Sequence, residues 1–151
     1  MIDITSKDIT EREAIAEGTV FIKPEVIKAI KAKKIPKGDV LEATKLAGIL
    51  AAKKTPELIP LCHPIPIEFV GLNLKLNRDK IVIRTTVRAK AKTGVEMDAL
   101  TATAIACLTI YDMCKPICKD ITISGIKLLK KTGGRSGTYI RNLKFKNQNS
   151  K

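Results

Sequence analysis

The sequence contains few aromatic side chains: among its 151 residues there are 3 Phe, 2 Tyr and no Trp. Proteins that bind single-stranded nucleic acid usually stack bases on exposed rings, so this chain would make a poor stacking platform. No run of about 18 apolar residues occurs, which argues against a membrane-spanning helix. Residues 1–10 carry Asp3, Lys7 and Asp8 and lack the apolar centre of a signal peptide. We therefore expect a soluble, cytoplasmic domain with no membrane partner.

Histidine and paired cysteines are also scarce. The chain has 1 His and 4 Cys, and none of the cysteines forms a C-x-x-C pair. A zinc site would need all the available ligands to converge, namely Cys62, His63, Cys114 and Cys118. Pro116 interrupts any helical face that the last two could share. Buried thiols are therefore favoured and no metal site is expected, with a zinc-binding interaction domain as an alternative.

Acidic residues are outnumbered, since 28 Lys plus Arg face 15 Asp plus Glu and give a net charge of +13. The excess is uneven: residues 1–22 hold five acidic and two basic residues, while residues 127–151 hold eight basic residues and no acidic one. Such a field suits nucleic acid or a small polyanion such as a nucleoside triphosphate. A lysine-rich solvated surface is a third interpretation of the same composition.

The common catalytic signatures are missing. The chain has no G-x-x-x-x-G-K-[ST] loop, no G-x-G-x-x-G after a strand, no H-E-x-x-H and no G-x-S-x-G. The glycine-rich segment 131–137 could cradle a phosphate with backbone amides and basic side chains. A flexible turn explains that segment equally well.

The hydropathy pattern favours one folded domain over residues 1–151, with flexible ends at 1–9 and 139–151. At 44% hydrophobic residues the chain is too apolar for disorder. Alternating apolar residues predict strands, at 19–22 (the end of one), 67–76, 81–90 and 120–129. Helical spacing predicts helices, at 25–34 after Pro24, 39–54 and 95–114. The order β-α-α-β-β-α-β indicates an α+β, ferredoxin-like sandwich, an antiparallel sheet with helices packed on one face.

Capping and proline signals mark the ends of these elements. Asp39 with Glu42, and Thr93 with Glu96, form two predicted capping boxes, so Glu96 is a capping residue first and a site residue second. Prolines between residues 56 and 66 keep His63 out of any helix. His63 is then either on the rim of a pocket or an ordinary loop imidazole.

Two carboxylates of the last predicted helix lie near one face, because Asp98 and Asp112 are fourteen residues apart and about 40° from alignment. An Asp late in a helix opposes the helix dipole. Lys115 follows Asp112 by about one turn, and the two form either a structural ion pair or an acid–base couple. Lys37 lies just before the Asp39 cap, where its ammonium could reach an anion or remain solvated.

Several of these residues lie in long motifs: LIPLCHP at 58–64, TGVEMDAL at 93–100 and TIYDMCK at 109–115. Shorter ones are KGDV at 37–40, AG at 47–48, AAKKT at 51–55 and the segment 128–137. Through these motifs the chain resembles the cyclic pyranopterin monophosphate synthase family, the molybdenum cofactor biosynthesis protein C family. The resemblance covers about residues 3 to 138.

The resemblance implies a defined reaction and assembly. Enzymes of the family rearrange a 3′,8-cyclised dihydroguanosine triphosphate into cyclic pyranopterin monophosphate and release diphosphate. The family fold is ferredoxin-like, and the family assembles as a hexamer, a trimer of dimers with sites between subunits. The expected partner is therefore a nucleotide-derived triphosphate rather than nucleic acid. No cofactor is expected, although Mg²⁺ could accompany the triphosphate.

The resemblance also assigns roles to individual residues. Those matching the family's catalytic positions are Asp112, Lys115 and Lys37, and we add His63 to the catalytic set as a residue that would help to orient the triphosphate. Those matching substrate-contacting positions are Leu61, Cys62, His63, Glu96, Met97 and Asp98. Those falling where the family places phosphate-binding groups are Arg12, Lys53 and Lys131, with Lys54 and Arg135 as further candidates. At Asp98 the family commonly has Glu, so the side chain here is one methylene shorter.

The implied chemistry suits these side chains. Several proton transfers call for groups with shifted pKa values, such as an Asp whose pKa burial raises. Expulsion of diphosphate calls for cationic stabilisation of the leaving group. The competing interpretation is a basic nucleic-acid-binding module that uses the segment 127–151.

Overall fold

The structure of the chain is a computed structural model, and it describes residues 1–143. The elements follow one another as β1 (Thr10–Phe21), α1 (Pro24–Lys31), α2 (Val40–Lys53), α3 (Thr55–Leu58), β2 (Ile67–Leu76), β3 (Lys80–Ala91), α4 (Glu96–Cys114), β4 (Thr122–Thr132) and β5 (Tyr139–Ile140). The strands form one antiparallel sheet in the order β2-β3-β1-β4-β5. The predicted α+β class and ferredoxin-like sandwich are confirmed.

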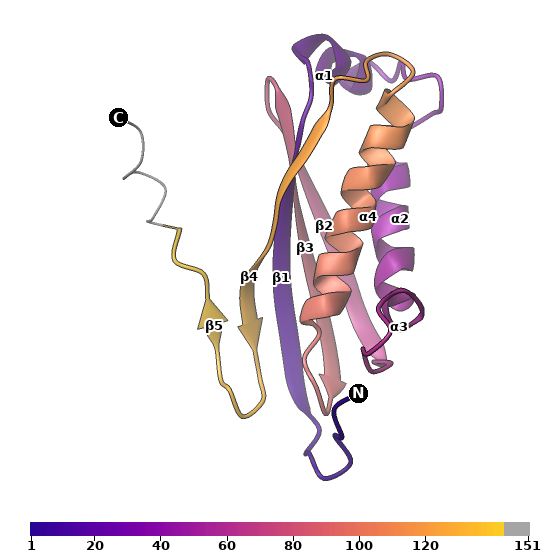
Figure 1. Ribbon diagram of the computed structural model, residues 1–151. Helices are drawn as coiled ribbons and strands as arrows, with labels where there is room; N and C mark the ends of the chain where they lie inside the picture. Colours follow the sequence, from indigo (N-terminus) through magenta and orange to yellow (C-terminus); the bar gives the residue numbers. More distant parts are fainter. Residues whose placement is uncertain (144–151) are drawn as a thin grey trace.

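Helices α2 and α4 lie side by side on one face of the sheet, and α1 closes one end of the molecule (Figure 1). α4 crosses β1 where that strand carries small buried residues, Ala16 and Gly18 among them. A Cβ atom at Gly18 would press against the side chains of Thr103 and Cys107 on α4. Small residues on β1 therefore let the helix pack close to the sheet.

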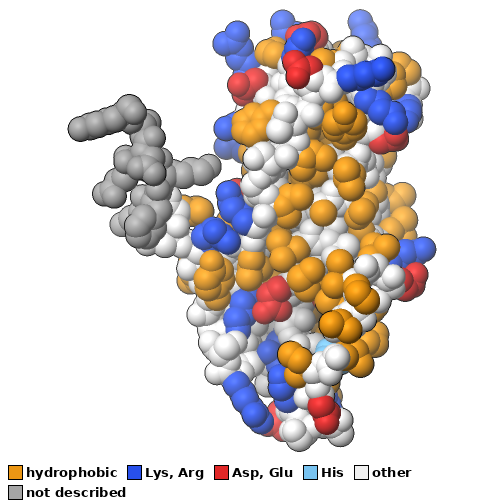
Figure 2. Space-filling view, in the orientation of Figure 1, with side chains coloured by type: hydrophobic (Ala, Val, Ile, Leu, Met, Phe, Trp, Pro, Cys, Tyr) orange, Lys and Arg blue, Asp and Glu red, His pale blue; other side chains and the backbone are white. Residues whose placement is uncertain are grey.

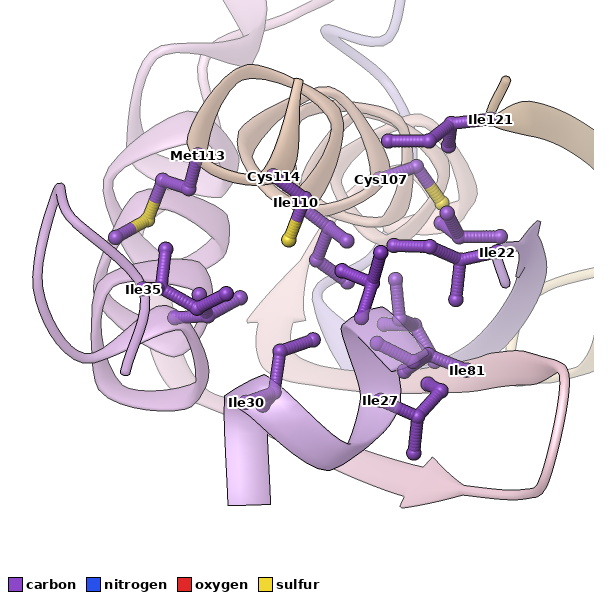
Figure 3. Packing of buried hydrophobic residues seen from close by; sticks show 14 of the residues in the cluster. Ile22, Ile27, Ile30, Ile35, Ile81, Cys107, Ile110, Met113, Cys114 and Ile121 are labelled. Atoms are coloured by element: carbon purple, nitrogen blue, oxygen red, sulfur yellow. The ribbon is translucent and has the colours of Figure 1, made fainter. Parts of the chain in front are cut away.

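The core consists of two clusters of buried residues. The larger lies at the α1 end and is rich in isoleucine, with sulfur-bearing side chains of α4 packed into it (Figure 3). The smaller contains Ala14, Val87 and Ala99. The buried hydroxyls of Thr103 and Thr85 lie 3.0 Å apart in a hydrogen bond that ties α4 to β3. This bond links α4 to β3 and pairs the Thr85 hydroxyl, which would be costly to bury unpaired.

The other face of the sheet carries charged pairs instead of helices. Two carboxylates of β1 each bridge two cations on neighbouring strands: Glu13 with Arg88 and Lys130, and Glu17 with Arg84 and Lys127. The hydrogen bond from Arg88 holds the pKa of Glu13 below its usual range. These pairs occupy the open face, and the helices lie on one side only, as the sequence predicts.

Several element bounds differ from the prediction. α1 ends at Lys31 rather than at residue 34, because Lys33 adopts a left-handed φ of 54°. β1 begins at Thr10 and β4 extends to Thr132. Both extensions are rich in charged residues, so they lack the alternation of apolar and polar residues that predicts a strand. The short elements α3 and β5 are absent from the prediction.

One of the two predicted capping boxes is wrong. Asp39 caps α2 as expected, since its Oδ1 accepts from the backbone N–H of Glu42 at 3.1 Å. At α4 the N-cap is Val95 and no side chain caps the helix, so Thr93 does not have the predicted role. The Glu96 carboxylate instead folds back over Gly94, where a Cβ atom would overlap it.

The predicted flexibility of the chain ends stays a prediction. Residues 1–9 form no helix or strand but are bonded to the fold through Lys92. Of the segment 139–151, residues 144–151 lie outside the described residues. Within residues 1–143, α4 alone is long and apolar enough to cross a membrane, and 56% of its apolar window is buried in the domain, as in a core helix.

Candidate functional site

A cluster of three charged side chains lies at the C-terminal end of α4. Nζ of Lys37 donates to Oδ2 of Asp112 at 2.8 Å, and Nζ of Lys115 lies 3.1 Å from Oδ1 of the same carboxylate. Lys37 comes from the turn between α1 and α2, where Gly38 has a φ of 115°. This turn carries its ammonium across to α4, so Lys37 is neither a solvated loop lysine nor directed at the start of α2.

The three charges determine the protonation of Asp112. Hydrogen bonds from Lys37 and then Lys115 lower its pKa, and the side chain is 54% exposed. Asp112 is therefore a stable carboxylate at neutral pH that orients two ammonium groups. The ion pair between Asp112 and Lys115 that the spacing predicts is present.

A second group of candidate residues surrounds the N-terminal end of α4. A cavity of about 220 Å³ is lined there by residues of the 61–63 loop and of the first turn of α4: Leu61, Cys62, His63, Glu96, Met97 and Asp98. The 61–63 loop follows α3 and leads toward β2, and the surrounding prolines keep it out of a helix. All six predicted substrate-contacting residues therefore lie around one cavity.

Asp98 is the buried carboxylate of this cavity, with an exposed fraction of 4%. Burial raises its pKa to about 6, and the charge of Glu96 adds to the shift while a hydrogen bond with Thr55 opposes it. The Asp with a raised pKa that the chemistry calls for is thus Asp98 and not Asp112. Burial, with the charge of Asp98, also raises the pKa of the Cys62 thiol, so Cys62 is a neutral wall residue rather than a nucleophile.

A larger, basic cavity of about 500 Å³ adjoins the first one, and Glu96 lines both. It carries five cationic side chains, from Lys7, Arg12, Lys92, Lys131 and Arg135, against the carboxylates of Asp8 and Glu96. Nε of Arg12 donates to the Ala91 carbonyl at 3.2 Å, and Nζ of Lys131 bonds Ser136. This excess of positive charge suits a polyanionic ligand.

The glycine-rich turn after β4 holds Arg12 in this cavity. Gly133 and Gly134 have φ values of 90° and 80°, which favour glycine. A Cβ atom at Gly133 would overlap the Glu11 carbonyl, and one at Gly134 would overlap the Arg12 guanidinium. The turn is therefore a close-packed support for Arg12 rather than a loose connection.

The structure separates the predicted catalytic residues into two groups. Asp112, Lys37 and Lys115 lie at one end of α4, whereas His63 lies at the other with the predicted substrate-contacting residues and with Arg12 and Lys131. The fourteen residues from Asp98 to Asp112 span about 21 Å along the helix axis. Lys53 and Lys54, at the C-terminal end of α2, are exposed and line neither cavity.

Two lysines that line the larger cavity, Lys7 and Lys92, are not among the predicted site residues. Lys7 lies in an acidic segment without regular structure, and Lys92 lies just beyond β3, so neither belongs to a recognisable pattern. The zinc alternative gains no support: Cys62 and Cys114 lie near opposite ends of α4, and within residues 1–143 no three His, Cys, Asp or Glu side chains are placed to hold a metal ion.

Comparison with known proteins places the chain among homologues over most of its length. The sequence model of the MoaC family matches residues 1–134. The cyclic pyranopterin monophosphate synthase of Aquifex aeolicus is 52% identical over 140 residues, 93% of this chain and 55% of that protein. The protein of the same name from a Roseiflexus species is 49% identical over 142 residues, 93% of this chain and 90% of that protein.

A third relative matches a shorter stretch of the chain. The probable cyclic pyranopterin monophosphate synthase of Sulfurisphaera tokodaii is 56% identical over 120 residues, 80% of each chain. The chain therefore spans about half the length of the Aquifex aeolicus relative and most of the length of the other two. All of the candidate residues except Arg135 lie inside the stretch that the family model matches.

Proposed function

The chain belongs to the MoaC family, and on that premise we propose that it is a cyclic pyranopterin monophosphate synthase, an enzyme of molybdenum cofactor biosynthesis. Its substrate is (8S)-3′,8-cyclo-7,8-dihydroguanosine 5′-triphosphate, and its products are cyclic pyranopterin monophosphate and diphosphate. The observation that carries the proposal is the family match over residues 1–134, which include all of the candidate residues except Arg135.

The two adjoining cavities supply complementary binding chemistry. The basic cavity receives the triphosphate, because its cations can balance the phosphate charges and stabilise the departing diphosphate. The smaller cavity, with His63 and Asp98, receives the ring system. Glu96 lies where the two meet.

The proton transfers of the ring rearrangement fall to groups at both ends of α4. Asp98, with a pKa of about 6, can accept and donate a proton near neutral pH. Lys37 and Lys115 supply ammonium groups that Asp112 holds in place. Asp112, Lys37, Lys115 and His63 are the proposed catalytic residues.

A complete site requires two copies of the chain. One copy cannot bring its two groups of residues together, because both are attached to α4, about 21 Å apart. Two copies whose α4 helices pack antiparallel about a two-fold axis would place the Asp98 end of one beside the Asp112 end of its partner. Such a dimer has two sites, and three such dimers form the proposed hexamer.

The helical face is suited to this contact. α4 carries no charged residue between Asp98 and Asp112. Leu108 is 54% exposed on this helix, and Leu46 and Leu50 are 59% and 48% exposed on the adjacent α2. Figure 2 shows hydrophobic side chains gathered along this face of the molecule. A continuous apolar surface of this kind is typical of a protein interface.

In this proposal, basic residues of the segment 127–151 have roles other than nucleic-acid binding. Lys127 and Lys130 pair with Glu17 and Glu13 on the sheet, and Lys131 lines the basic cavity. We therefore propose a small-molecule substrate, with neither nucleic acid nor membrane as partner, in a soluble cytoplasmic enzyme. The reaction needs no resident cofactor, and any Mg²⁺ would enter bound to the triphosphate.

Turnover of the cyclised substrate tests the activity directly. Purified protein should release diphosphate and form the pyranopterin product in equal amounts. Protein that is folded and oligomeric but releases neither would contradict the proposal.

Mixing two inactive variants tests the shared site. Asp112→Asn removes one half-site and His63→Ala removes the other, so a mixed dimer keeps one intact site of two. Random exchange of subunits should restore about a quarter of wild-type activity, since about half of the dimers are mixed. A mixture no more active than its separate components would place the whole site within one copy.

A further inference from the structure

The segment 1–9 forms a wall of the site at the N-terminal end of α4, although it has no helix or strand. Ile2, Ile4 and Lys7 line the smaller cavity together with His63 and Asp98. Lys7 is half-buried there. A segment in this position contacts any ligand that occupies the cavity.

Local hydrogen bonds and one lysine hold this wall in place. The Asp3 carboxylate accepts from the Thr5 backbone N–H at 2.8 Å, and the Lys7 backbone N–H donates to the Ile4 carbonyl at 3.1 Å. Nζ of Lys92, just after β3, donates to the Thr5 carbonyl at 3.0 Å. Lys92 therefore joins the segment to the sheet and sets the position of Lys7.

Lys7 is the only cationic Lys or Arg of the described residues that lines both cavities. Arg12, Lys131 and Arg135 line the larger cavity and not the smaller one. The ammonium of Lys7 thus belongs to the junction between the space for the ring system and the space for the outer phosphates.

We propose that Lys7 binds the phosphoryl group closest to the ring system of the substrate, an inference that rests on the proposed function. With the ring near His63 and the outer phosphates near Arg12 and Lys131, this first phosphoryl group lies at the junction. It is also the one that the product retains. Arg12 and Lys131 hold the two groups that leave.

This division fits the bond changes of the cyclisation. A substrate hydroxyl oxygen forms a new bond to the first phosphorus, and its proton passes to a base of the site. The bond from that phosphorus to the bridging oxygen breaks, and diphosphate leaves with the electron pair. Lys7 orients the phosphorus that is attacked, whereas Arg12 stabilises the charge on the leaving group.

Isothermal titration of the full chain with GTP and with inorganic diphosphate tests the assignment. Lys7→Met should weaken GTP binding by about 10- to 100-fold, the effect of one lost charge-assisted hydrogen bond. Diphosphate binding should change by less than about twofold, because diphosphate does not extend to the junction. Arg12→Met should weaken both ligands. Lys75→Met, on the edge strand β2 outside both cavities, is the matched control and should change neither.

The outcomes separate this inference from the proposed function. Unchanged GTP binding in Lys7→Met, or equal losses for both ligands, would overturn the assignment of Lys7. Wild-type protein that binds GTP but does not turn over the cyclised substrate would contradict the function, while the GTP comparison would still decide on Lys7. A wild-type chain that binds neither ligand would overturn both.

A double-mutant comparison tests the positioning role of Lys92. If Lys92 acts by holding the segment, Lys92→Met should weaken GTP binding in the wild-type chain and have little further effect in the Lys7→Met background. An equal loss in both backgrounds would show that Lys92 contacts the ligand independently and would refute the positioning role.

Discussion

Asp98 and Asp112 belong to one helix, yet their surroundings shift their pKa values in opposite directions. Burial raises the pKa of Asp98 to about 6, whereas hydrogen bonds from Lys37 and Lys115 lower that of Asp112. A carboxyl that titrates near neutral pH can exchange protons, and one held ionised can orient ammonium groups. The two carboxylates are therefore suited to different tasks in the same reaction.

Replacing Asp98 by Asn should stabilise the fold increasingly as the pH rises. The folded-state pKa of about 6 lies above the ordinary value of 3.8. The folded state therefore binds more protons in this window, and the wild type loses stability as pH rises through it. The shift corresponds to about 3 kcal/mol above pH 7 for this buried side chain. Thermal melts at pH 4 and pH 8 should show the gap widening in favour of Asp98→Asn, and a constant gap would contradict the assignment.

Asp112→Asn should abolish most of the activity while leaving the fold intact. The variant loses the charge that holds Lys37 and Lys115, and this carboxylate is half-exposed, so little packing changes. We expect kcat to fall by about 10²- to 10⁴-fold with an unchanged far-UV circular dichroism spectrum. Asp120→Asn is the matched control, since Asp120 also pairs with a lysine, Lys23, near this end of the molecule. Similar kcat values for the two variants would remove Asp112 from the catalytic group.

For individual residues, the sequence predicts those contacts that follow from local spacing or from a recognisable motif. Asp112 and Lys115 are three residues apart on a helix, so their contact follows from helical geometry. The partnership of Lys37 with Asp112 joins positions 75 residues apart, and motif resemblance alone suggested it. The raised pKa of Asp98 depends on burial beside Thr55, which is a product of tertiary packing and is not visible in the sequence.

Among the elements, the turn after β4 illustrates how a loop can position a charged side chain. Gly133 lies against the backbone of Glu11, next to Arg12, whereas Gly137 has a similar left-handed φ of 69° but open space around its Cβ position. A comparison of substitutions at the two glycines therefore separates the energetic cost of the left-handed backbone conformation from the cost of the close contact.

Gly133→Ala should be more damaging than Gly137→Ala. Both variants lose about 1–2 kcal/mol from the left-handed conformation. Only Gly133→Ala must also displace the Glu11 backbone, which carries Arg12 with it. We expect a lower melting temperature for both and a raised KM for Gly133→Ala alone. Equal KM values would show that the turn does not position Arg12.

The long elements were predictable because their periodicity extends over many residues. The strands 67–76 and 81–90 and the helix 95–114 agree closely with β2, β3 and α4. The two-residue strand β5 forms only by pairing with Lys130 and Lys131 of β4, so no local sequence pattern predicts it. The predicted Thr93 cap is wrong because the helix begins after Val95, and the Glu96 carboxylate lies over Gly94 instead of forming a capping box with Thr93.

For the molecule as a whole, the exposed helical face predicts that activity depends on assembly. Leu108→Glu puts a charge in the centre of the proposed two-fold contact. Because the side chain is exposed in the single copy, each subunit should still fold. Light scattering should show a mass well below about six times that of the 16.5 kDa chain, and turnover should be lost.

An added charge elsewhere provides the control. Asn73→Glu introduces the same charge on an exposed position of β2, away from the helical face. Its mass and activity should match those of the wild type. If Leu108→Glu remained oligomeric and active, the interface would lie on another surface.

The fold class followed from the order and periodicity of the elements, but the distribution of the site over the molecule did not. The sequence places Asp98 and Asp112 near one face of a helix, and this suggests proximity. The axial rise of fourteen residues separates them by about 21 Å, so angular alignment on a long helix does not bring side chains together.

In the proposed dimer, the two half-sites at opposite ends of α4 have a genetic consequence. In a cell with two alleles, a product defective at one end spoils one site of a mixed dimer and leaves the other working. A product defective at both ends, such as one carrying both Asp112→Asn and His63→Ala, spoils both sites of every dimer it enters. With equal expression and random pairing, the double mutant would leave about a quarter of the sites intact, whereas either single mutant would leave about half.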